Sequence, residues 1–314
     1  MSENLSKQET ILITGATGRH GGTSAHVVDE LLRNGHAVRV FARSESERTE
    51  RMKALGVDIA LGDFNDRRSL VAALDGVTTA TFTYPIAGGI VPAAATFASA
   101  AREKQNGLRI VVMSMAVAHP DSPSHLGRAQ WLAEEIFQWA GLDVCVLRIA
   151  ALFMENLATL HSTSIKANSG FANSFGHVNV PWISGIDAGR LMVAAILRPT
   201  LFEGHSVHYP PGAEQCSHDE IALMLSDVLG RPIRFNALTQ TEWTEDILAQ
   251  VQSDPDSMLN ADMAKHISAV GAALANSKAP IRLPNPEELR NLTGVKPISV
   301  REFITMNRDI FVTG

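Results

Sequence analysis

The sequence predicts an α/β protein, with a doubly wound parallel sheet in residues 1–150 and a smaller α+β part in residues 151–314. Short runs rich in β-branched residues alternate with longer amphipathic stretches, as in a sheet whose parallel strands are joined by helices. Glycine follows most of the amphipathic stretches, and glycine just beyond the last helical turn is a common stop signal. Six strand-like runs precede residue 150, which is the number in a full doubly wound sheet.

The first half of the chain divides into alternating strands and helices. The expected strands are residues 11–14, 37–41, 57–61, 79–83, 108–113 and 143–149. The expected helices are residues 23–34, 46–55, 67–74, 91–104 and 124–140. Right-handed crossovers between parallel strands place such helices on both faces of the sheet.

The second half has a different rhythm, and some of its segments can return to the sheet. Helices are expected at residues 187–197, 217–229, 286–292 and 299–311, with mostly helical structure at 241–275 and short strands at 205–208 and 234–236. Residues 150–180 have the least regular pattern, with Gly, Asn and Ser between 168 and 176. We therefore expect a loop there that closes over a ligand.

Composition and charge exclude several classes of protein. With 45% hydrophobic and 19% charged residues, the chain is neither disordered nor a coiled coil. The net charge of −6 argues against a nucleic-acid partner, because such binding depends on basic surfaces. No apolar run reaches the roughly 18 residues of a membrane helix, and residues 1–10 lack the apolar core of a signal peptide. We expect a cytoplasmic protein with no membrane contact and, since Cys145 and Cys216 lack metal-ligand spacing, no metal.

The strongest local signal lies between the first strand and the first helix, where the sequence is Gly15-Ala16-Thr17-Gly18-Arg19-His20-Gly21. In a turn that binds a dinucleotide, the first glycine permits the tight bend, the second lets the backbone approach the pyrophosphate, and the third lets the helix pack on the strand. The helix N-terminus then offers free N–H groups and a partial positive charge to the phosphates. The alternative is a glycine-rich turn without a ligand, but the position after the first strand favours a bound dinucleotide.

The end of the second strand distinguishes NAD from NADP. An NAD enzyme places Asp or Glu here to bind the ribose 2′-hydroxyl, whereas this sequence has Arg43. A guanidinium binds a 2′-phosphate through two hydrogen bonds, and Arg19 adds a second positive charge. NADP is therefore expected and NAD is less favoured, with a solvated surface charge as the alternative for Arg43. After the third strand, Asp63 is placed to accept from the adenine amino group and Phe64 to flank the ring, unless Asp63 is only a turn residue.

Four segments carry the pattern of one family. They are residues 14–21, the turn Gly62-Asp63, the segment Phe153-Met154-Glu155-Asn156 and the tail at 292–303. Over residues 10–311 the chain resembles the NmrA-like branch of the atypical short-chain dehydrogenases. The resemblance implies a Rossmann domain, a small C-terminal substrate domain, and NADP held by the matching loops, which include Thr83-Tyr84-Pro85. Members of this branch include quinone and dye reductases, and redox-sensing regulators that bind the dinucleotide without turning it over.

The chain departs from ordinary short-chain dehydrogenases at their catalytic pair. Those enzymes use Tyr-x-x-x-Lys, in which the Tyr donates a proton and the Lys lowers the pKa of the Tyr. Neither Tyr84 nor Tyr209 has a lysine four residues on, and the helix where relatives keep a lysine has Gln130 and Trp131. Alcohol dehydrogenation is therefore disfavoured.

Candidate catalytic and pocket residues follow from their places at strand ends. Tyr84, after the fourth strand, either lines the pocket or donates a proton. His125 at a helix start is a second candidate donor, with a surface or capping role as the alternative. Ser114 ends the fifth strand, where short-chain dehydrogenases keep a serine that orients a carbonyl. A substrate pocket, with core packing as the alternative for its apolar members, is expected at Phe153, Met154, Asn156 and Trp182.

Two functions remain open from the sequence. The first is an NADPH-dependent reductase that transfers hydride to a conjugated acceptor (a quinone, enone, iminium ion or dye), whose conjugation stabilises the reduced product without a strong acid. Its partner would be a small, largely apolar or aromatic substrate. The second is a non-catalytic NADP-binding redox sensor that reports to a regulatory protein partner. Either form is compatible with a homo-oligomer.

Overall fold

The computed structural model describes residues 9–18, 22–104, 107–254, 258–278 and 281–312. Among these residues the main element is a seven-stranded parallel sheet in the order β10-β6-β5-β4-β1-β2-β3. The strand order reverses between β1 and β4, and in open α/β sheets this reversal leaves a ligand crevice at the carboxyl ends of the strands. The strands are β1 (Thr10–Thr14), β2 (Ala37–Ala42), β3 (Asp58–Leu61), β4 (Val77–Phe82), β5 (Arg109–Met115), β6 (Asp143–Ile149) and β10 (Val207–His208).

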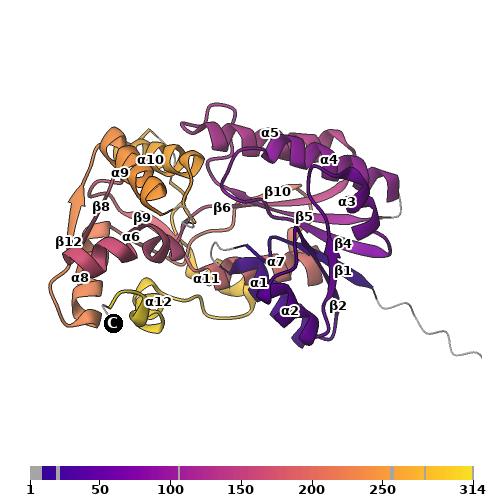
Figure 1. Cartoon of the computed structure of the whole chain (residues 1–314), viewed down its shortest axis with the longest axis horizontal. Helices are drawn as coiled ribbons and strands as arrows, with labels where there is room; N and C mark the ends of the chain where they lie inside the picture. Colours follow the sequence, from indigo (N-terminus) through magenta and orange to yellow (C-terminus); the bar gives the residue numbers. More distant parts are fainter. Residues whose placement is uncertain (1–8, 19–21, 105–106, 255–257, 279–280, 313–314) are drawn as a thin grey trace, which may run out of the picture.

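Helices cover both faces of this sheet (Figure 1). The core on one face has Phe82 of β4 at its centre, with the rings of Phe97 and Phe137 packed edge-on against it. The helices on this face are α3 (Arg67–Ala73), α4 (Ile90–Lys104) and α5 (His125–Trp139). The helices on the other side are α1 (Thr23–Arg33), α2 (Glu47–Ala54), α7 (Gly185–Leu197) and α11 (Pro286–Thr293).

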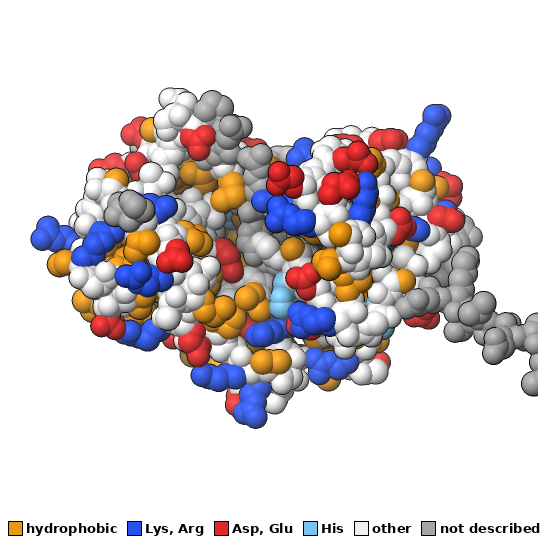
Figure 2. All heavy atoms as spheres, turned by 60° about the horizontal axis from the view of Figure 1, so that its bottom comes forward, with side chains coloured by type: hydrophobic (Ala, Val, Ile, Leu, Met, Phe, Trp, Pro, Cys, Tyr) orange, Lys and Arg blue, Asp and Glu red, His pale blue; other side chains and the backbone are white. Residues whose placement is uncertain are grey.

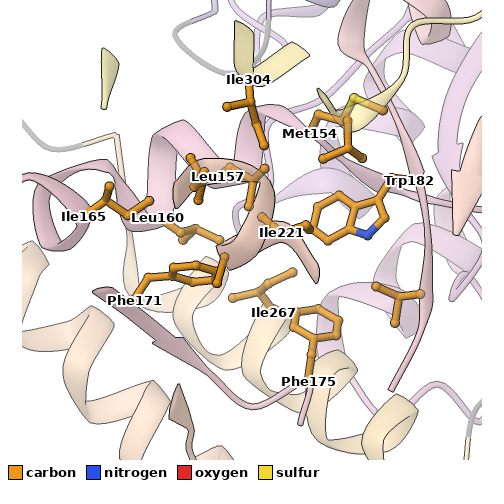
Figure 3. Close-up of a cluster of buried hydrophobic side chains, with 14 of the residues drawn as sticks. Met154, Leu157, Leu160, Ile165, Phe171, Phe175, Trp182, Ile221, Ile267 and Ile304 are labelled. Carbon is orange, nitrogen blue, oxygen red and sulfur yellow. The ribbon is translucent and has the colours of Figure 1, made fainter. Parts of the chain in front are cut away.

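A smaller lobe is built around its own hydrophobic core, to which α6, α8 and α10 contribute Leu160, Ile221 and Ile267 (Figure 3). Its strands pair as β11-β9-β7 and β12-β8. The strands are β7 (Leu152–Phe153), β8 (Gly170–Asn173), β9 (Val180–Ile183), β11 (Glu214–Cys216) and β12 (Arg234–Ala237). The helices are α6 (Glu155–Asn168), α8 (His218–Leu229), α9 (Gln240–Ser253), α10 (Ala261–Ala275) and α12 (Val300–Met306), and short 3₁₀ helices span Pro199–Phe202 and Arg308–Ile310.

The predicted α/β class and parallel sheet are confirmed. The six strands predicted before residue 150 are present, with ends that differ from the prediction by at most two residues. The second half of the chain contributes the seventh strand, β10, which pairs with β6. It also returns α7 to the sheet against α1, where Gly189 allows a close approach: a Cβ there would lie 3.1 Å from the Thr23 carbonyl oxygen.

The prediction of an irregular loop at residues 150–180 is wrong, because α6 and β8 occupy most of this stretch. The side chains of Leu157, Leu160, His161 and Ile165 are buried on one face of α6. Their spacing of three, four and eight residues is that of an amphipathic helix. The pattern was hidden because the buried face includes a histidine and the residues between are mostly Thr and Ser.

No helix in the described part of the chain has the length and apolarity needed to cross a membrane. Within the same residues, no three His, Cys, Asp or Glu side chains are grouped as metal ligands.

Candidate functional site

A cavity of about 270 Å³ lies at the carboxyl ends of the central strands, between the sheet and the smaller lobe. Figure 2 shows the surface recessed between these two parts. The walls are mainly apolar, with Met113 and Ile149 from the sheet and Met263 and Ile267 from α10. The polar groups on the walls include Ser24, Thr83, Ser114, Gln130, Glu155 and His266.

The glycine turn has the geometry of a phosphate-binding turn. Gly15 lines the cavity and has φ +78°, a conformation that favours glycine. The backbone N–H of Gly18 donates to the Gly15 carbonyl oxygen at 3.0 Å, and a Cβ at Gly18 would lie 2.9 Å from that oxygen. A side chain at Gly18 therefore does not fit the turn. Ala16 is buried beside it, whereas Arg19, His20 and Gly21 lie outside the described residues.

Two arginines stand beside this turn in different roles. Arg43 is exposed after β2 and has no hydrogen bond or ion pair among the described residues. Arg48 of α2 instead donates from Nη1 to the carbonyl oxygens of Thr17 and Gly18, each at 2.8 Å. Arg48 thus holds the turn, a role that the sequence did not reveal because the contact spans about 30 residues.

The ends of β1 and β4 are joined by Thr14. Its hydroxyl donates to the Thr81 carbonyl oxygen at 3.0 Å and accepts from the Thr83 backbone N–H at 2.8 Å. These bonds hold Thr83 beside the glycine turn, where a Cβ on Gly15 would lie 3.2 Å from the Thr83 side chain.

Three buried polar atoms on the cavity walls have no hydrogen-bond partner among the described residues. They are Oγ of Ser24, Oγ1 of Thr83 and Nε2 of Gln130. Buried polar atoms in folded proteins are nearly always paired, so atoms left open on a cavity wall indicate a polar ligand. The turn also has no room for a side chain at Gly18, so the backbone there can approach a ligand closely. Together these features fit a dinucleotide that lies across the ends of β1 and β4.

The turn after β3 is organised by Asp63 and Phe64. Oδ1 of Asp63 accepts from the backbone and side-chain nitrogens of Asn65 at 2.8 and 2.9 Å, so this carboxylate closes its own turn. The ring of Phe64 packs in an aromatic cluster, with centroids 5.5–6.3 Å from those of Phe41, Phe82, Tyr84 and Phe97.

Tyr84 lies on the cavity wall, whereas Arg43, Asp63 and Phe64 are not among the wall residues. Its hydroxyl donates to the Gly88 carbonyl oxygen at 3.2 Å. Burial raises the pKa of Tyr84, and the negative charge of Asp63 adds to the increase. A tyrosine with a raised pKa is a weaker acid, so this position favours a lining role over proton donation. Pro85, the next residue, is exposed and is absent from the wall.

Ser114 is on the cavity wall, but its hydroxyl is hydrogen-bonded to another protein side chain. It donates to Oε1 of the fully buried Glu134, a short contact. Oε2 of Glu134 accepts from Nε of Arg148 at 2.8 Å, and Arg148 also donates to the hydroxyl of Tyr209. This buried network anchors the end of β5 and leaves Ser114 a weak candidate for orienting a carbonyl.

Three other residues predicted for the site lie away from the cavity walls. Nε2 of His125 is 3.3 Å from Oδ1 of Asp262, and the His125 side chain is 42% exposed. Met154 and Trp182 are fully buried in the core of the smaller lobe (Figure 3), and the Trp182 indole N–H donates to the Cys216 carbonyl oxygen at 3.1 Å. Of the predicted pocket set, Phe153 and Asn156 line the cavity.

Glu155 and His266 are among the wall residues that were not predicted from the sequence. Both carboxylate oxygens of Glu155 lie 2.9 Å from the Gly185 backbone nitrogen at the start of α7, and burial raises the pKa of Glu155 to about 7. Nδ1 of His266 is 2.6 Å from Oγ of Ser124, and burial lowers the pKa of His266 to about 4. For Glu155, its place in the family-like segment was a usable signal, whereas His266 had none.

Comparison with known proteins identifies the family. Residues 7–304 match the model of the NmrA-like family. The chain belongs to this family. This NmrA-like protein is 31% identical over 234 residues to an NAD(P)H azoreductase of Xenophilus azovorans. The matched region covers 73% of this chain and 77% of the azoreductase.

Solved structures agree with the fold of this NmrA-like protein. An NADPH-dependent quinone oxidoreductase of Escherichia coli, complexed with NADPH, superposes with a TM-score of 0.79 at 18% identity, over 95% of this chain and 99% of the other. NmrA, a negative transcriptional regulator solved in complex with NADP, superposes with a TM-score of 0.72 at 18% identity, over 95% and 94%. Both an enzyme and a regulator therefore share this architecture.

Proposed function

We propose that this protein is an NADPH-dependent reductase that transfers hydride to a conjugated, largely apolar acceptor without a Tyr–Lys proton relay. When bound, NADPH supplies the hydride. The observation that carries the proposal is a mainly apolar cavity on whose walls three buried polar atoms have no hydrogen-bond partner within residues 9–18, 22–104, 107–254, 258–278 and 281–312. The azoreductase and the quinone oxidoreductase found by comparison are named for conjugated groups, which supports this class of acceptor.

Most of the residues that would hold the cofactor follow the ends of β1, β2, β3 and β4. The backbone at Gly15 and Gly18 would face the pyrophosphate, with Ala16, Thr17 and, from the sequence alone, Arg19, His20 and Gly21 completing the turn. The guanidinium of Arg43 would bind the 2′-phosphate, which favours NADP over NAD. Asp63 and Phe64, which follow β3, would meet the adenine, and Tyr84, which follows β4, would line the pocket. Oγ of Ser24, Oγ1 of Thr83 and Nε2 of Gln130, which are unpartnered among the described residues, would bond polar groups of the ligand.

The polar residues of the wall explain why a conjugated acceptor is favoured. A saturated ketone needs a positioned acid, because its reduction creates a localised alkoxide. Here the Ser114 hydroxyl is bonded to Glu134, the pKa of Tyr84 is raised, and Gln130 presents a neutral amide. A quinone or a dye spreads the new electron pair over its conjugated system, so alignment alone carries most of the catalysis.

Calorimetric titration with NADPH and NADH, followed by NADPH oxidation with a naphthoquinone, an azo dye, an enone and a triphenylmethane dye, tests the proposal. We expect tighter binding of NADPH than of NADH, and oxidation of NADPH by at least one conjugated acceptor. Tight NADPH binding without oxidation by any acceptor would instead support the redox sensor. Absence of NADPH binding would contradict both functions.

A further inference from the structure

Ser124 and His266 come from different parts of the molecule and fix each other's hydrogen atoms. Ser124 precedes α5, and its Oγ accepts from the backbone N–H groups of Leu126 and Gly127 at 3.1 and 3.4 Å. A serine hydroxyl has two acceptor sites and one donor. With both acceptor sites used, the remaining O–H is directed to Nδ1 of His266, 2.6 Å away.

This arrangement determines the tautomer of His266. Nδ1 must accept the Ser124 proton, so in the neutral ring the N–H lies on Nε2. The ring is neutral because burial lowers the pKa of His266 to about 4, with the nearby His125 adding to the decrease. His266 lines the cavity, and its Nε2 has no partner in the described part of the chain.

We propose that the Nε2–H of His266 is a catalytic hydrogen-bond donor to the acceptor substrate. It binds the carbonyl oxygen or the nitrogen on which negative charge gathers as hydride arrives. The inference rests on the proposed reductase function and names the chemical class of acceptor: a conjugated molecule with an oxygen or nitrogen at the far end of its π system. Ser124 is a positioning residue that acts through His266.

The electron and proton balance of this step is simple. The acceptor would gain a C–H bond at one end of its conjugated system as a C–H bond of the reduced nicotinamide breaks, so NADPH would be oxidised to NADP⁺, and the displaced π electron pair moves to the oxygen or nitrogen at the other end of the acceptor. The Nε2–H bond of His266 stays intact and stabilises that anion by a hydrogen bond, which is strong in a cavity with mainly apolar walls. Water then supplies the proton that completes the product. A neutral imidazole suits this role because it donates without giving up its proton.

Three variants separate this hydrogen bond from packing. His266→Leu removes the donor, and His266→Gln keeps an N–H at similar reach. His161→Leu is the matched control, because His161 is a buried histidine of the same lobe that is absent from the cavity wall. With a naphthoquinone we expect kcat to fall about 100- to 1,000-fold in His266→Leu and to recover at least about tenfold in His266→Gln, with the control and the NADPH Kd within about twofold of wild type.

The tautomer gives a readout independent of activity. Nitrogen-15 correlation spectra of His266 should show the proton on Nε2 in the wild type and a mixture of tautomers in Ser124→Ala. A proton on Nδ1 overturns the inference, and so does a His266→Leu variant that keeps the kcat of an active wild type. Failure of the proposed function would look different, because the wild type itself would then leave NADPH unoxidised by every acceptor. That result would also remove the catalytic role of His266.

Discussion

Oγ of Ser124 lies 2.6 Å from Nδ1 of His266, and this contact joins α5 of the sheet to α10 of the smaller lobe. A second link lies close by. Oδ2 of Asp262, at the start of α10, accepts from the Gly88 backbone N–H at 2.8 Å, and its Oδ1 is 3.3 Å from Nε2 of His125. These two links seat α10 against the start of α5 and the segment after β4. They fix one wall of the cavity relative to the glycine turn on the other side.

Gly18→Val should remove cofactor binding and leave the fold intact. Even the Cβ of the new side chain would meet the Gly15 carbonyl oxygen at 2.9 Å, and the rest of the side chain would occupy the space that the pyrophosphate needs. Calorimetry should show NADPH binding lost, while circular dichroism shows the secondary structure retained and thermal unfolding shows a lowered midpoint, because the turn must shift to accept the Cβ. Normal NADPH binding by this variant would mean that the glycine turn has been misinterpreted.

Arg43 and Arg48 should differ in their effect on the two cofactors. Arg43→Asp should weaken NADPH binding by about 1–3 kcal/mol, the scale of one charge-assisted contact, and should leave NADH binding nearly unchanged. Arg48→Ala should weaken both cofactors alike, because Arg48 holds the carbonyl groups of Thr17 and Gly18 and not a 2′-phosphate. Titration of each variant with both cofactors measures this. Equal affinity of the wild type for NADH and NADPH would refute the role of Arg43.

Tyr84→Phe should have a small effect on turnover. The Tyr84 hydroxyl is bonded to the Gly88 carbonyl oxygen, and its pKa is raised by burial and by Asp63, so it is poorly suited to give up a proton. We expect kcat with a quinone to fall far less than the about 100- to 10,000-fold that a positioned general acid contributes. Steady-state kinetics decides this, and a loss within that range would make Tyr84 the proton donor.

Glu155 should make stability depend on pH. Burial raises the pKa of its carboxyl from 4.5 to about 7, so between these values the folded protein binds a proton that the unfolded chain lacks. Its contribution to the free energy of unfolding therefore decreases as pH rises through this range. In urea unfolding, Glu155→Gln should gain on the order of 1–3 kcal/mol relative to wild type between pH 5.5 and 7.5, and nothing further above pH 8. A difference that does not change with pH would contradict the raised pKa.

The sequence was most informative where the signals are local. The β-branched runs and the glycine after each helix define β1 to β6, because strand propensity and helix termination depend on neighbouring residues. The tight turn at Gly15 has the same local origin. The helix α6 was missed because His161 lies on its buried face, where only the tertiary packing accommodates it.

The site was predicted less completely, because its contacts join distant parts of the chain. Ser124 and His266 are 142 residues apart, and no local pattern connects them. Trp182 was expected at the cavity but lies in the core of the smaller lobe. An apolar side chain near a site can pack into the cavity or into the core behind it, and the sequence does not distinguish the two. His125 was predicted to lie near the cavity because it begins a helix there. Its side chain instead contacts Asp262 of the smaller lobe and lies outside the cavity wall.

The central claim is hydride transfer to a conjugated acceptor without a Tyr–Lys relay. The most direct measurement compares kcat/KM for a naphthoquinone with that for a saturated cyclic ketone of matched size, using NADPH with wild type and Tyr84→Phe. We predict that both proteins reduce the quinone and that neither reduces the ketone efficiently. Efficient reduction of the ketone by the wild type, abolished in Tyr84→Phe, would demonstrate an acid relay and contradict this account.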